Sequence, residues 1–223
     1  SVLVQPVDER HFSPELMRRI LDARSAGRSV AVATRISTGV SAIAEAHTAP
    51  ADDWLLAVYE PPLRLAIVGA VHIAQSLVPM ARALGYAPFV IDPRAAFARG
   101  RFEDVEVSPL WPDEALRARK PDSRSAIVTL THDPKLDDPA LAAALASPAF
   151  YIAALGSRKT HAARLERLKA QGFDDAQLAR IQGPAGLAIG AKSPADALHT
   201  ALYRIFLAHR RASAQVPVLL DLL

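Results

Sequence analysis

Cysteine is absent from the 223 residues of this chain. Disulfide bonds, zinc–thiolate sites, iron–sulfur clusters and thiol or persulfide chemistry on the chain are therefore excluded, because each needs a cysteine sulfur. Long apolar runs are lacking too: none approaches the roughly 20 residues of a membrane-spanning helix, and no signal-peptide pattern precedes Ser1. We therefore expect a cytoplasmic protein with no membrane span.

An excess of charge of one sign is also missing. The chain has 26 basic and 23 acidic residues, which gives a formal net charge of +3. No arginine-rich arm or basic run with interleaved aromatic side chains is present, so nucleic acid is not expected as a partner. Apolar residues at 51% and charged residues at 22% are typical of a globular protein, and the length allows one large domain or two small ones.

Two adjacent prolines after residue 60 indicate a junction between two parts of the chain. Ahead of them, Ser13-Pro14-Glu15 is a typical helix start, and we expect that helix to end at Gly27. Residues 29–34 are rich in β-branched side chains and predict a strand, residues 2–6 predict a shorter one, and the stretch before the prolines has little pattern. We therefore predict a small α/β segment over residues 1–60.

From Arg64 onward, apolar strand-like runs alternate with helical patterns, which is typical of a parallel sheet with helices on both faces. We predict strands at residues 65–68, 88–91, 126–130 and 150–154, and a short further strand at 104–107. Helices are predicted at residues 73–84, 136–145, 157–171, 174–180 and 194–209, with a glycine-rich loop at 183–190. Residues 61–223 are therefore predicted to form one Rossmann-like α/β domain.

The first strand of that domain runs into Gly69-Ala70-Val71-His72 and then into a helix. In such sheets the carboxyl ends of the strands form the binding crevice, where a phosphate meets backbone N–H groups and the positive end of a helix dipole. A dinucleotide fingerprint has glycine at the position of Val71. A β-branched residue at positive φ there would carry strain of about 1–3 kcal/mol, so we predict a reshaped turn and no ordinary NAD(P) binding. A turn kept for packing, with His72 as an exposed cap, is the alternative.

Asp92 ends the second strand 23 residues after Gly69, close to the spacing expected of an acid that binds a ribose. Arg94 follows it, and a guanidinium can bind a phosphate or an anionic ring edge through two parallel hydrogen bonds. The alternative is a local Asp–Arg pair at the surface, which would contribute little to stability.

Thr131-His132-Asp133 follows the third strand and is expected at the same crevice. A His–Asp pair can act as a base, a metal partner or a hydrogen-bond donor, but no nucleophile accompanies it here. Asp133 precedes a proline, so the alternative is that it begins a turn or caps a helix.

Gly156-Ser157-Arg158-Lys159 joins the fourth strand to a helix. A glycine, a hydroxyl and two cations at the positive end of a helix dipole form an arrangement that binds anions. Cations in a first turn oppose the dipole, and a bound phosphate would offset that cost. A solvated helix start is the alternative.

These motifs together resemble the XdhC/CoxI family of accessory proteins for xanthine dehydrogenase and carbon monoxide dehydrogenase. The resemblance is carried, in order, by residues 69–74, 91–94, 101–102, 131–138, 155–158, 180–181 and 186–194. Residues 2–39 also resemble the stretch that precedes the Rossmann domain in that family.

The resemblance implies a protein that binds molybdenum cofactor transiently, protects it during sulfuration by a cysteine desulfurase and helps to insert it into the apoenzyme of a molybdenum hydroxylase. Such a role is that of a chaperone more than of an enzyme, and we assign neither a catalytic residue nor a metal ligand. The residues assigned to cofactor binding are Gly69, Ala70, His72, Asp92, Arg94, Thr131, His132, Asp133, Gly156, Ser157, Arg158 and Lys159.

The chain also departs from the family pattern, so we expect a divergent member. The family usually has glycine at the positions of Val71 and Ala153, histidine at Gln182, an acid at Ala188, and carboxylates at Ala195 and Arg204. The cysteine-containing part of the family's amino-terminal domain is missing from this chain.

Two further functions stay open, namely an NAD(P)-dependent oxidoreductase and a scaffold that binds only partner proteins. Oligomeric state is open as well. The apolar residues 216–223 either dock against a second copy, which would make a homodimer, or close the core.

Overall fold

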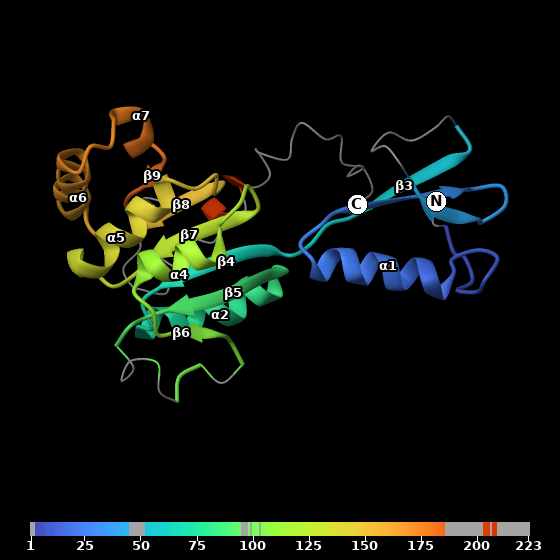
Figure 1. Cartoon of the computed structure of the whole chain (residues 1–223), viewed down its shortest axis with the longest axis horizontal. Helices are drawn as coiled ribbons and strands as arrows, with labels where there is room; N and C mark the ends of the chain where they lie inside the picture. Colours follow the sequence, from blue (N-terminus) through green and yellow to red (C-terminus); the bar gives the residue numbers. More distant parts are fainter. Residues whose placement is uncertain are drawn as a thin grey trace. The chain divides into compact units, whose positions relative to one another are not determined.

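The structure is a computed structural model (Figure 1), and it describes residues 3–44, 52–94, 98, 100–102, 104–185, 203–205 and 207–208. The chain divides into two compact units, Ser1–Pro62 and Leu63–Leu223. Among the described residues, no helix combines the length and the apolar character that a membrane span needs. The predicted apolar tail 216–223 lies outside the described residues.

The first unit consists of one helix and a three-stranded antiparallel sheet. Helix α1 (Pro14–Ser25) begins as predicted, because the Ser13 hydroxyl accepts a hydrogen bond from the Leu16 N–H at 3.1 Å. The sheet has the order β2-β1-β3, with β1 at Val30–Arg35, β2 at Ser41–Ile43 and β3 at Trp54–Tyr59. Apolar side chains of α1, Leu16 and Ile20 among them, pack against Val32 of β1.

Two features of this unit differ from the sequence prediction. Residues 3–6 are not in a strand, so the prediction for residues 2–6 is wrong. Strands β2 and β3 were not predicted, because β2 has only three residues and the side chains of β3 do not alternate between apolar and polar.

The second unit contains a six-stranded parallel sheet (Figure 1). Its strands are β4 (Leu63–Val68), β5 (Tyr86–Ile91), β6 (Val107–Ser108), β7 (Ser125–Thr129), β8 (Tyr151–Ala154) and β9 (Ile181–Gln182). Their order in the sheet is β6-β5-β4-β7-β8-β9, so the chain moves outward from β4 in one direction and then returns to continue on its other side. This is the Rossmann strand order, and its switch point lies between β4 and β7.

Helices cover both faces of this sheet, as predicted. They are α2 (His72–Ala83), α4 (Pro112–Arg119), α5 (Pro134–Leu145), α6 (Arg158–Ala170) and α7 (Asp175–Leu178). On one face Leu77 of α2 packs with Leu65 and Ile67 of β4. On the other face Leu116 of α4 and Leu141 of α5 pack with other residues of the sheet. Each face is buried by its own helices, which is why the strands read as continuous apolar runs.

Most predicted elements of the second unit are confirmed, with ends that differ by a residue or two. The short strand expected at 104–107 instead occupies Val107–Ser108. Helix α4 was not predicted, because its mostly charged sequence buries only Pro112, Ala115 and Leu116. The glycine-rich loop from residue 186 onward, and most of the last predicted helix, lie outside the described residues, although residues 203–205 and 207–208 are helical.

Candidate functional site

The predicted site residues all follow strands that end at the same edge of the parallel sheet. Strands β5, β4, β7 and β8 are neighbours in the sheet and run in the same direction, so their carboxyl ends lie side by side (Figure 1). We call the segments that directly follow these four strands the carboxyl edge. The segments are residues 69–72 after β4, 92–94 after β5, 131–133 after β7 and 156–159 after β8.

The turn after β4 depends on glycine at position 69. Gly69 has φ +113°, and a Cβ atom there would lie 2.8 Å from the Thr131 Cγ2 atom, closer than real Cβ contacts. Val71 has φ −82°, which is ordinary extended backbone, so Val71 carries no strain in this turn. Among the described residues no side chain caps α2, so the N–H groups of its first turn face the carboxyl edge without a capping side chain.

Asp92 closes that turn from the neighbouring strand. The backbone N–H of Ala70 donates to Asp92 Oδ2 at 2.8 Å. Arg94 adds three more bonds: its backbone N–H and Nε donate to Oδ1 at 2.9 Å each, and Nη2 donates to Oδ2 at 2.8 Å. Asp92 is only 1% exposed, and although burial acts to raise its pKa, the hydrogen bonds from Arg94 and Ala70 outweigh burial and lower it.

The Asp92–Arg94 ion pair that the sequence offered as the alternative is present. It is no surface ion pair, because the carboxylate is buried. Each of its oxygens already accepts two hydrogen bonds, so a ribose hydroxyl would have to replace one of them. Arg94 is partly exposed; the hydrogen bond to Asp92 raises its pKa, and the charges of Asp133 and Asp137 add to that rise.

The segment after β7 is organised by the Thr131 hydroxyl. It donates to Asp137 Oδ1 at 2.6 Å and accepts the Asp133 backbone N–H at 3.1 Å. Asp133 is the N-cap of α5, where its Oδ1 accepts the Lys135 N–H at 2.9 Å, as the capping alternative predicts. His132 is exposed with φ +61°, an uncommon conformation for a residue other than glycine. No hydrogen bond joins the side chains of His132 and Asp133 among the described residues, and no group there could hold a metal ion.

The segment after β8 begins helix α6. Gly156 has φ +142°, and the Ser157 hydroxyl accepts the Thr160 N–H at 3.1 Å, which makes Ser157 the N-cap. Arg158 and Lys159 are exposed in the first turn, which contains no acidic residue. Two cations at this end of a helix oppose the dipole, so the segment favours an anion.

A buried ion pair that the sequence did not reveal lies beneath this edge. Arg164 of α6 and Asp137 of α5 each expose 2% of their side chains, and Arg164 Nη2 lies 3.4 Å from Asp137 Oδ2. The same Nη2 donates to the Leu155 carbonyl at 3.0 Å. Burial raises the pKa of Asp137, because desolvation outweighs the hydrogen bond from Thr131 and the charge of Arg164. The spacing of Arg164, Leu165 and Leu168 is the signal that could have placed an arginine on the buried face of α6.

These observations agree with the comparisons with known proteins. The family model for the XdhC Rossmann domain matches residues 65–198. The chain belongs to this family.

This XdhC-family chain is similar to the molybdenum cofactor insertion chaperone PaoD of Escherichia coli (strain K12), with 30% identity over 129 residues. That alignment covers 58% of the chain but only 35% of the relative, so the chain spans about a third of the length of the relative. A Bacillus halodurans protein solved as a xanthine dehydrogenase superposes with a TM-score of 0.78 over 96% of this chain and 72% of that one, at 23% identity. That likeness concerns the fold alone.

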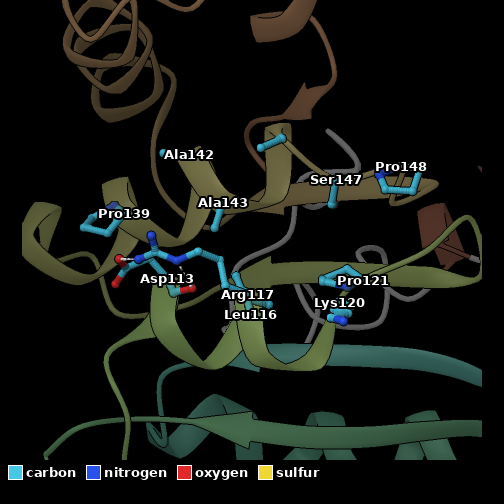
Figure 2. Close-up of a pocket in the computed structure, with 11 residues that line it drawn as sticks. Asp113, Leu116, Arg117, Lys120, Pro121, Pro139, Ala142, Ala143, Ser147 and Pro148 are labelled. Atoms are coloured by element: carbon cyan, nitrogen blue, oxygen red, sulfur yellow. Dashed lines mark hydrogen bonds and ion pairs between the residues drawn. The ribbon is translucent and has the colours of Figure 1, made fainter.

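One cavity of the XdhC-family domain lies away from the carboxyl edge. It has a volume of about 470 Å³ and lies between α4 and α5 (Figure 2). Leu116, Ala142 and Ala143 contribute apolar lining, and Arg117 pairs with Asp113 at its side. None of the sequence-predicted site residues lines this cavity.

Proposed function

We propose that this chain is an accessory protein that binds molybdenum cofactor at the carboxyl edge and assists its insertion into a molybdenum hydroxylase. The observation that carries the proposal is the gathering of anion-binding groups at that edge in a member of the XdhC family. The uncapped start of α2, the guanidinium of Arg94 and the cations of the α6 start follow β4, β5 and β8, and these strands end at the same edge of the sheet. The similarity to an insertion chaperone supports the same role.

The residues at the edge fit the chemistry of this cofactor, a pterin that carries a phosphate. Backbone N–H groups at the start of α2, together with Arg158 and Lys159, would hold the phosphate. Arg94, which is held in a fixed orientation by Asp92, would donate to an anionic edge of the ring. When bound, the cofactor supplies the molybdenum centre that the client enzyme uses. The residues of this chain would bind it, orient it and shield it from water.

The partners follow from what this chain can and cannot supply. Because the chain has no cysteine, it has no thiol of its own that could carry the sulfur atom, and we propose a cysteine desulfurase as the sulfur donor. The apoenzyme of a molybdenum hydroxylase would receive the cofactor, so binding here would be transient. We propose the cytoplasm as the place of this transfer.

The experiment compares the chain purified from a host that makes molybdenum cofactor with the chain from a host that cannot. Bound pterin is oxidised and measured by fluorescence. We expect pterin only in the first preparation, and a loss of about tenfold in the Arg158→Ala/Lys159→Ala variant, because about 1.4 kcal/mol of phosphate binding would be lost. Lys169→Ala is the control, since Lys169 lies at the other end of α6 and pairs with Asp175.

Equal fluorescence from the two hosts, or unchanged retention in the double variant, would contradict the proposal. A saturable NADH fluorescence signal at millimolar or lower ligand would favour the oxidoreductase alternative instead. Failure of both ligands to bind, with a hydroxylase still co-purifying, would favour the scaffold.

A further inference from the structure

A chain of polar contacts links the segments after β7 and β8 below the carboxyl edge. It runs from the Thr131 hydroxyl to Asp137 Oδ1 at 2.6 Å, from Asp137 Oδ2 to Arg164 Nη2 at 3.4 Å, and from the same Nη2 to the Leu155 carbonyl at 3.0 Å. The side chains of Thr131, Asp137 and Arg164 form what we call the brace. The brace therefore connects Thr131, in the turn after β7, to the Leu155 carbonyl, which directly precedes the Gly156 turn after β8.

The brace also reaches the turn after β4. Gly69 approaches Thr131 so closely that a Cβ atom would lie 2.8 Å from its Cγ2 atom. The position of the Thr131 side chain, which Asp137 fixes through its hydrogen bond, therefore limits where the Gly69 turn can lie. Three of the four segments of the carboxyl edge depend on this one set of side chains.

Burial of the Arg164 side chain in this position is energetically unfavourable. Its side chain is 2% exposed, and among the described residues its Nε and Nη1 atoms are buried without a hydrogen-bond partner. A buried guanidinium with a single distant carboxylate is poorly compensated, so packing alone would favour an apolar side chain here. A cation at this depth does place positive charge under Gly156, whose missing Cβ would lie 3.8 Å from Nη2. That charge adds to the field of the α6 dipole at the same turn.

We propose that Thr131, Asp137 and Arg164 are positioning residues, which hold the turns after β7 and β8 in the arrangement that binds an anion and place a buried cation beneath it. The inference rests on the proposed function in one respect, namely that the anion is the phosphate of the cofactor. None of the three side chains needs to touch the ligand. Their effect is carried by the Leu155 carbonyl, the Gly156 turn and the Gly69 turn.

A second ion pair between the same two helices provides a matched control. Asp138 of α5 pairs with Arg167 of α6, with Nε at 2.5 Å from Oδ2 and Nη2 at 2.9 Å from Oδ1. The carboxylate is 8% exposed, and Arg167 also donates to the Ala163 carbonyl within α6. This pair joins α5 to α6 as the brace does, but none of these contacts reaches the carboxyl edge.

The test uses hydrogen–deuterium exchange of the ligand-free chain. The variant Asp137→Asn/Arg164→Gln removes both charges together, so that no buried charge is left alone and the domain can still fold. We expect exchange at amides 131–133 and 155–160 to rise about tenfold while the amides of β7 stay protected. In the control Asp138→Asn/Arg167→Gln, the same turn amides should change by less than about twofold. Equal effects of the two variants on the turns, or unchanged turns in the brace variant, would overturn the proposal.

Retention of pterin by the same variants gives a second readout. The brace variant should retain about tenfold less pterin than the control variant, and Arg164→Lys, which keeps both buried charges, should retain more than the brace variant. Equal retention by Arg164→Lys and the brace variant would overturn the role of the buried charge. If the unmodified chain retains no pterin, the proposed function fails, but exchange at the turns still decides whether the brace positions them.

Discussion

Two buried aspartates lie on opposite sides of the switch point and differ in how their charge is compensated. Asp92, after β5, accepts four hydrogen bonds, and its pKa is lowered despite its burial. Asp137, in α5 after β7, accepts one short bond from Thr131 and a longer one from Arg164, and its pKa is raised. Both residues are almost inaccessible to solvent, but Asp137 lies deeper in the domain and accepts fewer hydrogen bonds, so desolvation outweighs the hydrogen bonds at Asp137 and not at Asp92.

The difference separates two kinds of support for a binding site. The β4–β5 half is closed by a complete clamp, in which Asp92 fixes Ala70 and Arg94. The β7–β8 half rests on the brace, where Arg164 keeps two unpaired groups among the described residues. The fully bonded Asp92 holds the first half rigid. The incompletely paired Arg164 places positive charge beneath the second half. We expect substitutions to affect the two halves differently.

The largest effect is expected from Asp92→Asn. This variant should lower the free energy of unfolding by about 3 kcal/mol, because an amide NH2 would face donors that now bond to a carboxylate. The double variant Asp137→Asn/Arg164→Gln should cost about 1 kcal/mol, because the weak ion pair is lost but both buried charges are removed with it. Urea unfolding of both variants measures the difference. An equal cost for the two would contradict the distinction between clamp and brace.

A smaller loss of stability is expected at Gly69, where the turn after β4 contacts Thr131. Gly69→Ala should cost about 2 kcal/mol, because alanine would have to adopt positive φ and its methyl group would clash with Thr131. Gly85→Ala is the matched control: Gly85 also has positive φ, +80°, but nothing lies within 4 Å of its missing Cβ. It should cost about 1 kcal/mol from backbone strain alone. An equal loss of stability in the two variants would show that the close approach of Gly69 to Thr131 does not contribute to the cost of Gly69→Ala.

The smallest effect is a difference in pH dependence. The folded-state pKa of Asp92 lies below its ordinary value of 3.8, so the stability from Asp92 is present above that value and is lost as the pH falls through the folded pKa. The pKa of Asp137 is raised, so its contribution falls as the pH rises from 3.8 through the folded pKa.

Unfolding midpoints of Asp92→Asn and Asp137→Asn, measured against the unmodified chain from pH ~3 to ~7, should therefore give difference curves of opposite slope. Asp122→Asn serves as a reference for a more exposed carboxylate with a lowered pKa, and its curve should have the sign of the Asp92 curve. Two curves of the same slope for Asp92 and Asp137 would contradict the assignment.

The sequence predicted the parallel sheet well, because its strands are buried on both faces and therefore read as apolar runs between glycine turns. The capping roles of Ser13 and Asp133 could also be predicted from the sequence, because a cap depends on neighbours three or fewer residues away. Helix α4 and strand β3 were missed, because their burial depends on the elements they pack against and leaves no clear period in the sequence.

At the site, the sequence predicted the turns but not the contacts between them. Asp92 stood at the spacing of a ribose-binding acid, and only the folded chain brings Ala70 and Arg94 onto its two oxygens. Arg164 lies 27 residues from Asp137, a separation that no local pattern can bridge. Interactions between distant segments set the charge state of buried groups, so a motif alone could not assign their roles.

The most direct test of the binding site is a crystal structure of the chain purified from a host that makes molybdenum cofactor. We predict a pterin whose phosphate lies within hydrogen-bond distance of the α2 start or the Gly156–Lys159 turn, with Asp92 still bound to Ala70 and Arg94. A pterin bound between α4 and α5 instead, in the cavity of Figure 2, would contradict the assignment of the carboxyl edge.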